Sequence, residues 1–236
     1  MMGVVGGPDP VVTDGLILAL DAGNKRSYPG SGGTWYDISG NGNDVGMVNA
    51  VWTDAGPNSY WLFDGVSDYG IISSLNGFTN TTNATVFCIF RSSMTSNGSL
   101  LGFGTETSNT NDIYTWTTNN RHGLNTWNGD SWGVENVVTA NATADIAATY
   151  QFKFGGSNKE GFNMFINGQE QTETQVAGTT QERTRSTQFG IGLNGWNTSA
   201  QTWKGRIYYL AVYNDSVTTA KALQNYNAQK ARYLYN

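Results

Sequence analysis

Charge is scarce in this chain, and the few charged residues do not cluster. Only 13% of the 236 residues are charged, about half of the roughly 25% that is usual for globular proteins. The net charge is −5, and no run of lysine or arginine is present. A nucleic-acid-binding protein needs a basic stripe that displaces counterions. The composition therefore argues against nucleic acid as a partner.

Long apolar runs, cysteine and histidine are scarce as well. The apolar runs span a handful of residues, far short of the roughly 20 that cross a bilayer, so we expect no membrane insertion. Cys88 is the only cysteine and His122 the only histidine, which excludes an internal disulfide and a two-histidine metal site. We expect Cys88 to be a buried, unreactive thiol and His122 to lie in a surface turn.

Aromatic residues and glycine are abundant instead, with 13% aromatics and 30 glycines. This composition is typical of strands joined by short turns. The segments predicted as strands are Leu16–Asp21, Val45–Trp52, Tyr60–Phe63, Tyr69–Ser73, Thr85–Arg91, Leu100–Gly104, Ile113–Thr117, Gly123–Trp127, Ala147–Phe154, Asn163–Asn167, Gln188–Leu193 and Arg206–Tyr213. Strict alternation in the last segment would place Ile207, Tyr209, Ala211 and Tyr213 on one face.

The end of the chain carries the pattern of a helix. Thr218 fits the N-cap position, and Val217 is placed to pack on Ala222 as a hydrophobic staple. Helical spacing predicts one apolar stripe made of Ala222, Leu223, Tyr226, Tyr233 and Leu234. We therefore expect a short C-terminal helix.

The beginning of the chain differs from the rest. Residues 1–14 are rich in Gly and Pro, so we predict a flexible arm over 1–14 and a single domain over 15–236. We expect no signal peptide, because the first ten residues lack its positive and apolar regions. The arm residues expected to contact a partner subunit are Val4, Val5, Pro8, Pro10 and Val11.

Several short motifs carry a resemblance to a known family. They are residues 18–24 (Leu-Ala-Leu-Asp-Ala-Gly-Asn), residues 35–43 (Trp-Tyr-Asp-Ile-Ser-Gly-Asn-Gly-Asn), Phe-Asp-Gly at 63–65 and the Asn-Gly pair at 167–168. With these motifs the chain resembles concanavalin A-like, laminin-G-type jelly-roll domains of the kind found in tailed-bacteriophage virion proteins. The resemblance implies an all-β fold, a two-sheet antiparallel jelly-roll sandwich with a short C-terminal helix.

Two stretches combine tryptophan with Asn or Asp, the residue types that bind the ring face and the hydroxyls of a sugar. The first contains Trp127, Asn128, Asp130 and Trp132, and the second contains Trp196. The alternative is that these tryptophans lie buried at strand ends, where amphipathic rings are common.

The acidic residues allow a calcium site but no familiar catalytic pattern. Asp64 and Asp68 bracket a turn and are the expected Ca²⁺ ligands, with Asp21 or Asp37 as additions. The alternative is that these acids cap turns through backbone amides. The Glu-x-Asp-x-x-Glu string of glucanases with this fold is absent. We expect no catalytic residues and no cofactor besides, at most, Ca²⁺.

These observations favour a non-enzymatic virion structural protein on the particle exterior, either a capsid decoration protein or a tail or fibre component. It would be anchored through its arm to capsid or tail subunits in many copies, after assembly in the host cytoplasm. The alternative is a carbohydrate-binding adhesin module that recognises host-surface glycans. A glycoside hydrolase is the third and least supported reading.

Overall fold

The computed structural model describes residues 10–79, 83–94, 98–104, 113–117, 121–126, 130–135, 145–152, 162–172, 174–177, 187–193 and 202–233. Within these ranges the strands form two antiparallel sheets. Sheet A runs β14 (Gln169–Glu170), β13 (Phe162–Ile166), β12 (Ile146–Phe152), β7 (Ala84–Ser92), β17 (Lys204–Tyr213), β5 (Tyr60–Asp64) and β4 (Val51–Thr53), and β1 (Leu16–Asp21) also pairs with β17. Sheet B runs β15 (Thr174–Ala177), β11 (Asp130–Glu135), β10 (Arg121–Thr126), β9 (Ile113–Thr117), β8 (Leu101–Phe103), β16 (Phe189–Ile191), β6 (Tyr69–Ile72), β3 (Val45–Val48) and β2 (Thr34–Trp35). A 3-10 turn, η1 (Gly56–Asn58), and one helix, α1 (Thr219–Tyr233), complete the described elements.

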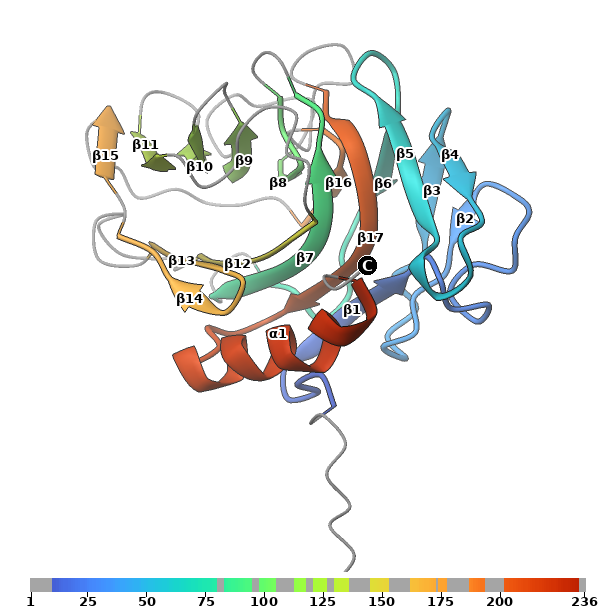
Figure 1. The fold of residues 1–236 in the computed structure, drawn as a ribbon, viewed down its shortest axis with the longest axis horizontal. Coiled ribbons are helices and arrows are strands. Elements are labelled where there is room, and N and C mark those ends of the chain that lie inside the picture. The colour runs from blue at the N-terminus through green and yellow to red at the C-terminus, as the bar shows by residue number, and fades with distance from the viewer. Residues whose placement is uncertain are drawn as a thin grey trace, which may run out of the picture.

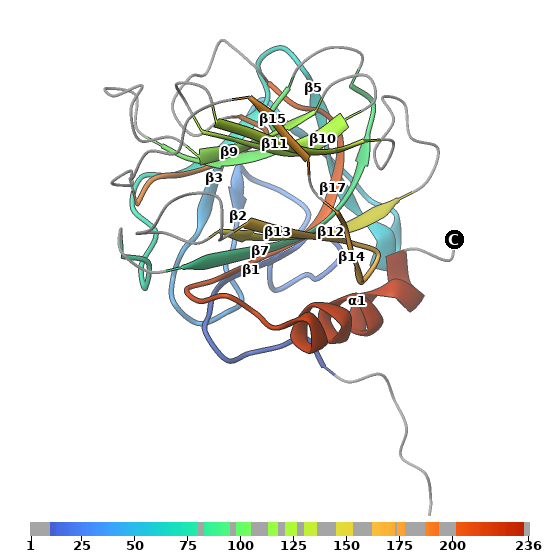
Figure 2. The ribbon, with the colours of Figure 1, turned by 90° about the vertical axis from the view of Figure 1, so that its left-hand side faces the viewer.

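The two sheets stack face to face, and α1 lies on the opposite face of sheet A (Figures 1 and 2). One apolar cluster fills the space between the sheets and includes Leu18, Trp35 and Phe90. A second cluster lies between sheet A and α1 and includes Phe87 and Tyr209. The structure therefore confirms the predicted jelly-roll sandwich with a C-terminal helix. We call the face of sheet A that meets α1 its outer face.

Strand β7 shows how both faces of sheet A become buried. Val86, Cys88 and Phe90 belong to the cluster between the sheets, whereas Phe87 and Ile89 belong to the cluster under α1. Burial of Cys88 is complete and raises the pKa of its thiol. The prediction that this thiol is buried is confirmed, and its lack of reactivity stays a prediction.

Strand β17 departs from the predicted alternation. Its register shifts between Ile207 and Tyr209, so that Ile207 pairs with Phe90 and Tyr209 with Ile89. Such a bulge places two successive side chains, Tyr208 and Tyr209, on the outer face. Ile207 belongs instead to the core between the sheets. The expected sharing of a face by Ile207 and Tyr209 is therefore wrong, because alternation does not continue through a bulge.

The segment predicted as one strand over 45–52 is two strands in different sheets. Asn49 has a φ of 58°, a conformation that Asn tolerates better than most residues. The turn at this residue ends β3 in sheet B and leads into β4 at the edge of sheet A. Apolar patterning alone did not reveal this change of sheet.

Helix α1 begins as the sequence predicts. The Thr218 side chain accepts a hydrogen bond from the Lys221 amide at 3.3 Å, and Val217 and Ala222 lie in the same buried cluster. The predicted stripe is only partly correct: Leu223 is 39% exposed, and Asn225 is buried in its place. This helix is too short and too polar to cross a membrane.

Asn225 is buried because it holds the N-terminal segment against the helix. Its Oδ1 accepts a hydrogen bond from the Val12 amide at 2.8 Å, and its Nδ2 donates to the Tyr213 hydroxyl at 3.0 Å. That hydroxyl donates to the Val12 carbonyl at 3.1 Å. Val12 is buried and Val11 is half-buried in the cluster under α1. Val11 and Val12 are therefore packed against the helix, and the boundary between arm and domain at residue 14 stays a prediction.

Residues 34–43 form a corner that is held by hydrogen bonds to Asp37. One Asp37 oxygen accepts hydrogen bonds from the amides of Ala19 and Ser39 at 2.9 and 2.8 Å. The other oxygen accepts a bond from the Asn43 amide at 3.0 Å. Asp37 thus joins the corner to β1, and its oxygens are occupied by backbone amides.

Candidate functional site

The predicted sugar-binding residues fall mostly outside the described residues. Trp127, Asn128 and Trp196 lie there, and so do the arm residues Val4, Val5 and Pro8. Asp130 and Trp132 belong to β11, in which Asp130 pairs with Thr126 and Trp132 with Leu124 of β10. The predicted strand over 123–127 corresponds to β10, whereas β11 was not among the predicted strands. Sugar binding by this hairpin stays a prediction.

His122 also lies in this hairpin. It is part of β10, where its backbone pairs with Val134 and Thr117. The prediction of a turn at His122 is wrong, because its backbone belongs to a strand. The polar sequence around His122 does not prevent pairing with two neighbouring strands.

Asp64 and Asp68, predicted as calcium ligands, bind backbone amides of the turn between β5 and β6. One Asp64 oxygen accepts hydrogen bonds from the amides of Val66 and Ser67 at 2.7 and 3.0 Å, and Asp68 accepts one from the Asp64 amide at 2.7 Å. The Ser67 and Val66 amides lower the pKa of Asp64, whereas burial raises the pKa of Asp68. Within the described ranges, no three His, Cys, Asp or Glu side chains gather into a metal-binding group. The two acids act as turn caps here, and calcium binding stays a prediction.

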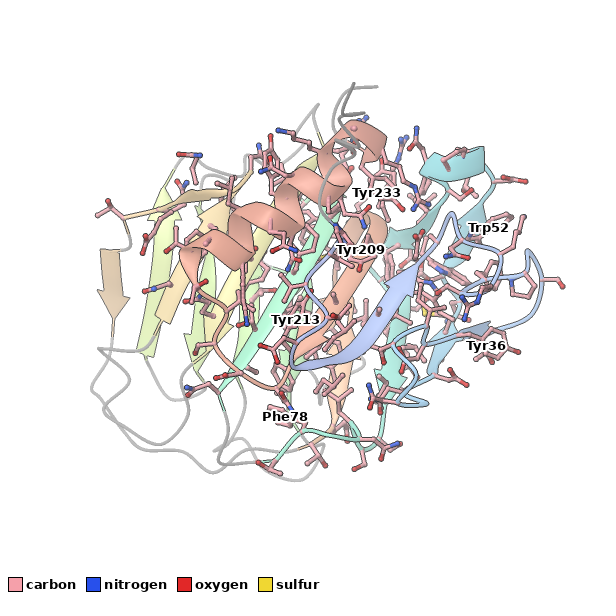
Figure 3. All side chains as sticks on the ribbon, turned by 90° about the horizontal axis from the view of Figure 1, so that it is seen from below. Tyr36, Trp52, Phe78, Tyr209, Tyr213 and Tyr233 are labelled. Atoms are coloured by element: carbon pink, nitrogen blue, oxygen red, sulfur yellow. The ribbon has the colours of Figure 1, made fainter. Side chains whose placement is uncertain are left out.

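A hollow of about 170 Å³ opens on the outer face of sheet A, beside the C-terminal end of α1. It is lined by Ala55, Asn58, Tyr60, Arg91, Asp145, Arg206, Tyr208 and Tyr233. We call it the outer-face hollow. Figure 3 views this face and shows Tyr233 at the end of the helix, with Tyr36 well away from it near β2.

The polar wall of the hollow comes from three adjacent strands. The Arg91 guanidinium donates two hydrogen bonds of 2.8 Å to the two carboxylate oxygens of Asp145. Arg206 lies next to Arg91 across the β7–β17 pair. Its guanidinium stands 4.6 Å from the ring centre of Tyr60. Two guanidinium groups and one carboxylate therefore meet in one opening.

The aromatic wall consists of three tyrosines in a row. The rings of Tyr60 and Tyr208 lie 5.5 Å apart, and those of Tyr208 and Tyr233 lie 5.6 Å apart. Burial raises the pKa of Tyr208 to about 12, and the neighbouring Asp145 carboxylate adds to this shift. The phenol of Tyr208 is therefore neutral near pH 7 and able to donate or accept hydrogen bonds. Asn58 adds an Oδ1 atom that is buried and has no hydrogen-bond partner in the described part of the chain.

A clamp at the end of α1 holds the hollow together. Arg232 donates hydrogen bonds of 2.6 and 2.8 Å to the two oxygens of Asp21 in β1, and its Nε donates to the Pro57 carbonyl of η1 at 2.7 Å. The Tyr233 hydroxyl donates to Asp21 at 3.0 Å. A Cβ at Gly23 would collide with the Pro57 carbonyl oxygen, so glycine lets these segments meet. Asp21, a possible calcium ligand in the sequence, serves this clamp instead.

The sequence contains a weak signal for this hollow that the patterns above did not exploit. Arg91 ends the apolar run of β7 and Arg206 precedes the apolar run of β17, in a chain with only 13 lysines and arginines. An arginine inside an apolar strand must reach water, a carboxylate or a ligand. Their placement as neighbours needed the register of β7 against β17, which the sequence does not give.

No family model and no curated protein matches the chain, whereas solved structures match over most of it. A Trypanosoma rangeli sialidase gives a TM-score of 0.67 at 13% identity over 96% of this chain. The binding domain of botulinum neurotoxin serotype D gives 0.66 at 14% identity over 92%, and the receptor binding domain of botulinum neurotoxin type G gives 0.62 at 12% identity over 92%. The chain spans 37%, 53% and 52% of the lengths of these three structures. At such identities the likeness shows the fold alone, and that fold is a β-sandwich jelly roll.

Proposed function

We propose that the chain is a non-enzymatic carbohydrate-binding module and that the outer-face hollow is its binding site. The observation that carries this proposal is the meeting of three tyrosine rings with Arg206 and the Arg91–Asp145 pair in one opening. Binding pockets typically combine apolar and aromatic walls with a few convergent polar groups. A sugar has both an apolar C–H face and hydroxyl groups, so it matches such a surface.

The absence of catalysis in this proposal rests on the carboxylates of the hollow. Cleavage of a glycosidic bond by the usual route requires two carboxylic side chains flanking it. Among the described residues that line the hollow there is one, Asp145, and both of its oxygens are engaged by Arg91. Because these bonds hold both of its oxygens, Asp145 is poorly suited to act as a catalytic acid or base. It can instead accept hydrogen bonds from the hydroxyl groups of a sugar and orient them.

The similarity to a botulinum neurotoxin receptor binding domain and to a sialidase supports the proposal at the level of architecture. Both share the sandwich with this chain, and the first is named for binding. The residues of the hollow, rather than this likeness, give the module its proposed ligand class.

The test is a glycan array with four forms of the protein. Tyr60→Ala removes an aromatic wall of the hollow, and Tyr36→Ala is the matched control because Tyr36 is 42% exposed and lies elsewhere on the surface. We expect the wild type and Tyr36→Ala to bind the same saccharides, and Tyr60→Ala to bind them about tenfold less tightly. Binding that survives Tyr60→Ala but is lost in a Trp127→Ala, Trp132→Ala double variant would move the site to the β10–β11 hairpin.

We further propose that this module sits on the exterior of a phage particle as a decoration, tail or fibre component, present in many copies. The packing of Val11 and Val12 under α1 supports a tethering role, because it holds the chain just after residues 1–9 against the domain. Deleting residues 1–9 should leave the fold intact and abolish incorporation into particles. Normal incorporation of that deletion variant would show that residues 1–9 do not act as the tether.

A further inference from the structure

The charges of the outer-face hollow are unequal. Arg91 is matched by Asp145 through two hydrogen bonds of 2.8 Å. Arg206, in contrast, has no carboxylate partner in the described part of the chain, and it contacts the ring of Tyr60 and the hydroxyl of Tyr208. The described residues that line the hollow therefore carry one positive charge in excess, on a chain whose net charge is −5.

The surface beside Arg206 is apolar. Leu62 of β5 pairs with Arg206 of β17, and Val51 of β4 pairs with Leu62. Directly paired residues of neighbouring strands point to the same face, so Arg206, Leu62 and Val51 form a row across the outer face. Leu62 is 42% exposed and Val51 is 58% exposed. An extended ligand that meets Arg206 can therefore continue over an apolar strip toward the edge of sheet A.

From this row we infer that the ligand is an acidic saccharide whose carboxylate binds the Arg206 guanidinium. This inference rests on the proposed function and names the class of sugar. A guanidinium presents two parallel N–H donors that match the two oxygens of a carboxylate. One excess positive charge balances the single negative charge of a carboxylate, whereas a phosphate monoester would bring more charge than the hollow offsets.

The size of the hollow is consistent with one sugar unit. Its volume of about 170 Å³ is smaller than the roughly 300–1,000 Å³ of pockets that enclose whole drug-sized ligands. One acidic unit would occupy it with its carboxylate on Arg206 and a hydroxyl donating to Asp145. The neighbouring units of the oligosaccharide would lie with their C–H faces over Leu62 and Val51.

The experiment measures the affinity of carboxylated oligosaccharides by calorimetry at low salt. The probes are oligogalacturonate, alginate and hyaluronan fragments, the methyl ester of oligogalacturonate, a neutral malto-oligosaccharide and dextran sulfate. The variants are Arg206→Gln, Arg206→Lys and Lys221→Gln. Lys221 lies at the other end of α1 and its side chain is 37% exposed, so Lys221→Gln removes the same charge without touching the hollow.

We expect at least one carboxylated probe to bind the wild type and Lys221→Gln equally well. Arg206→Gln should bind it roughly tenfold to a hundredfold less tightly, because a charge-assisted hydrogen-bonded pair is lost. Arg206→Lys should be intermediate, since it keeps the charge but not the two-pronged geometry. Esterifying the carboxylates should weaken binding to the wild type by a similar factor.

Three results would overturn the inference: equal affinity for the acid and its methyl ester, wild-type affinity in Arg206→Gln, or no binding of any carboxylated probe. Stronger binding of dextran sulfate than of every carboxylated probe would also overturn it. If neutral sugars bind and Tyr60→Ala weakens them, the carbohydrate-binding module stands and only its acidic ligand is rejected. If no saccharide of either kind responds to Tyr60→Ala, the proposed function itself is rejected.

Discussion

The outer face of sheet A has two halves that differ in what covers them. Under α1, Phe87 and Phe165 are about 1% exposed. Beyond the end of the helix, Leu62 and Val51 are 42% and 58% exposed. Both halves belong to the same hydrogen-bonded sheet, so the helix that covers one of them accounts for the difference.

The boundary between these halves is marked by two arginines. Along the outer face of β7, Phe87 and Ile89 are followed by Arg91, and along β17 the buried Tyr209 gives way to Arg206. Arg91 and Arg206 are directly paired. The apolar side chains thus stop on both strands at the same register, where the cover ends and the hollow opens. The outer-face hollow therefore forms where the apolar residues covered by α1 end, and not in a separate loop.

The largest expected effect contrasts one side chain from each half. Phe87→Ala should lower the free energy of unfolding by about 3–5 kcal/mol, because it leaves a cavity under α1. Leu62→Ala should cost less than about 1 kcal/mol, because Leu62 is largely in contact with solvent. Urea unfolding followed by tryptophan fluorescence measures both. Similar losses in the two variants would erase the distinction between the halves.

The next effect concerns the clamp that ends the cover. Asp21→Asn should lower the free energy of unfolding by about 3 kcal/mol, since it leaves Arg232 without its buried carboxylate. Lys221→Gln breaks the exposed Lys221–Asp14 pair at the other end of α1 and should lower the free energy of unfolding much less, because solvent screens an exposed ion pair. Thermal unfolding of both variants provides the measurement. Equal losses at the two ends would show that the clamp contributes no more than a surface ion pair.

A smaller effect is expected from alkaline pH. Burial raises the pKa of Tyr208 to about 12, and it also raises the pKa values of Tyr209, Tyr213 and Tyr233. An unfolded tyrosine titrates near pH 10, so the folded state holds these protons more tightly. For Tyr208 the stabilisation is complete below about pH 10 and is lost as the pH rises toward 12, by roughly 1 kcal/mol per pH unit. Urea midpoints that stay constant from about pH 9 to about pH 11.5 would contradict this expectation.

Local patterns predicted the elements whose determinants are close in sequence. The bounds of β1 are as predicted, Asn167 and Gly168 form the expected turn with positive φ, and Thr218 caps α1. In each case a few adjacent residues set the backbone. The hairpin of β10 and β11 was missed in part, because its Trp- and Asn-rich sequence resembles a loop.

The outer-face hollow could not be predicted in the same way. Its lining residues run from Ala55 to Tyr233 and come from η1, β5, β7, β17 and α1. Their meeting depends on the β7–β17 register, on the bulge after Ile207 and on the clamp of Arg232. The burial of Asn225 and the packing of Val12 were not predicted for a related reason. Each depends on the hydrogen bond between these two residues, which are far apart in the sequence. Long-range pairing decides all of these features.

The most direct test of the central claim locates the bound saccharide. Hydrogen exchange of the protein is followed by mass spectrometry with and without the oligosaccharide that binds best on the array. Binding in the outer-face hollow should add protection to the backbone around residues 55–60 and 204–208, two segments that contain lining residues of the hollow. Protection confined to residues 121–135 of the β10–β11 hairpin would contradict it.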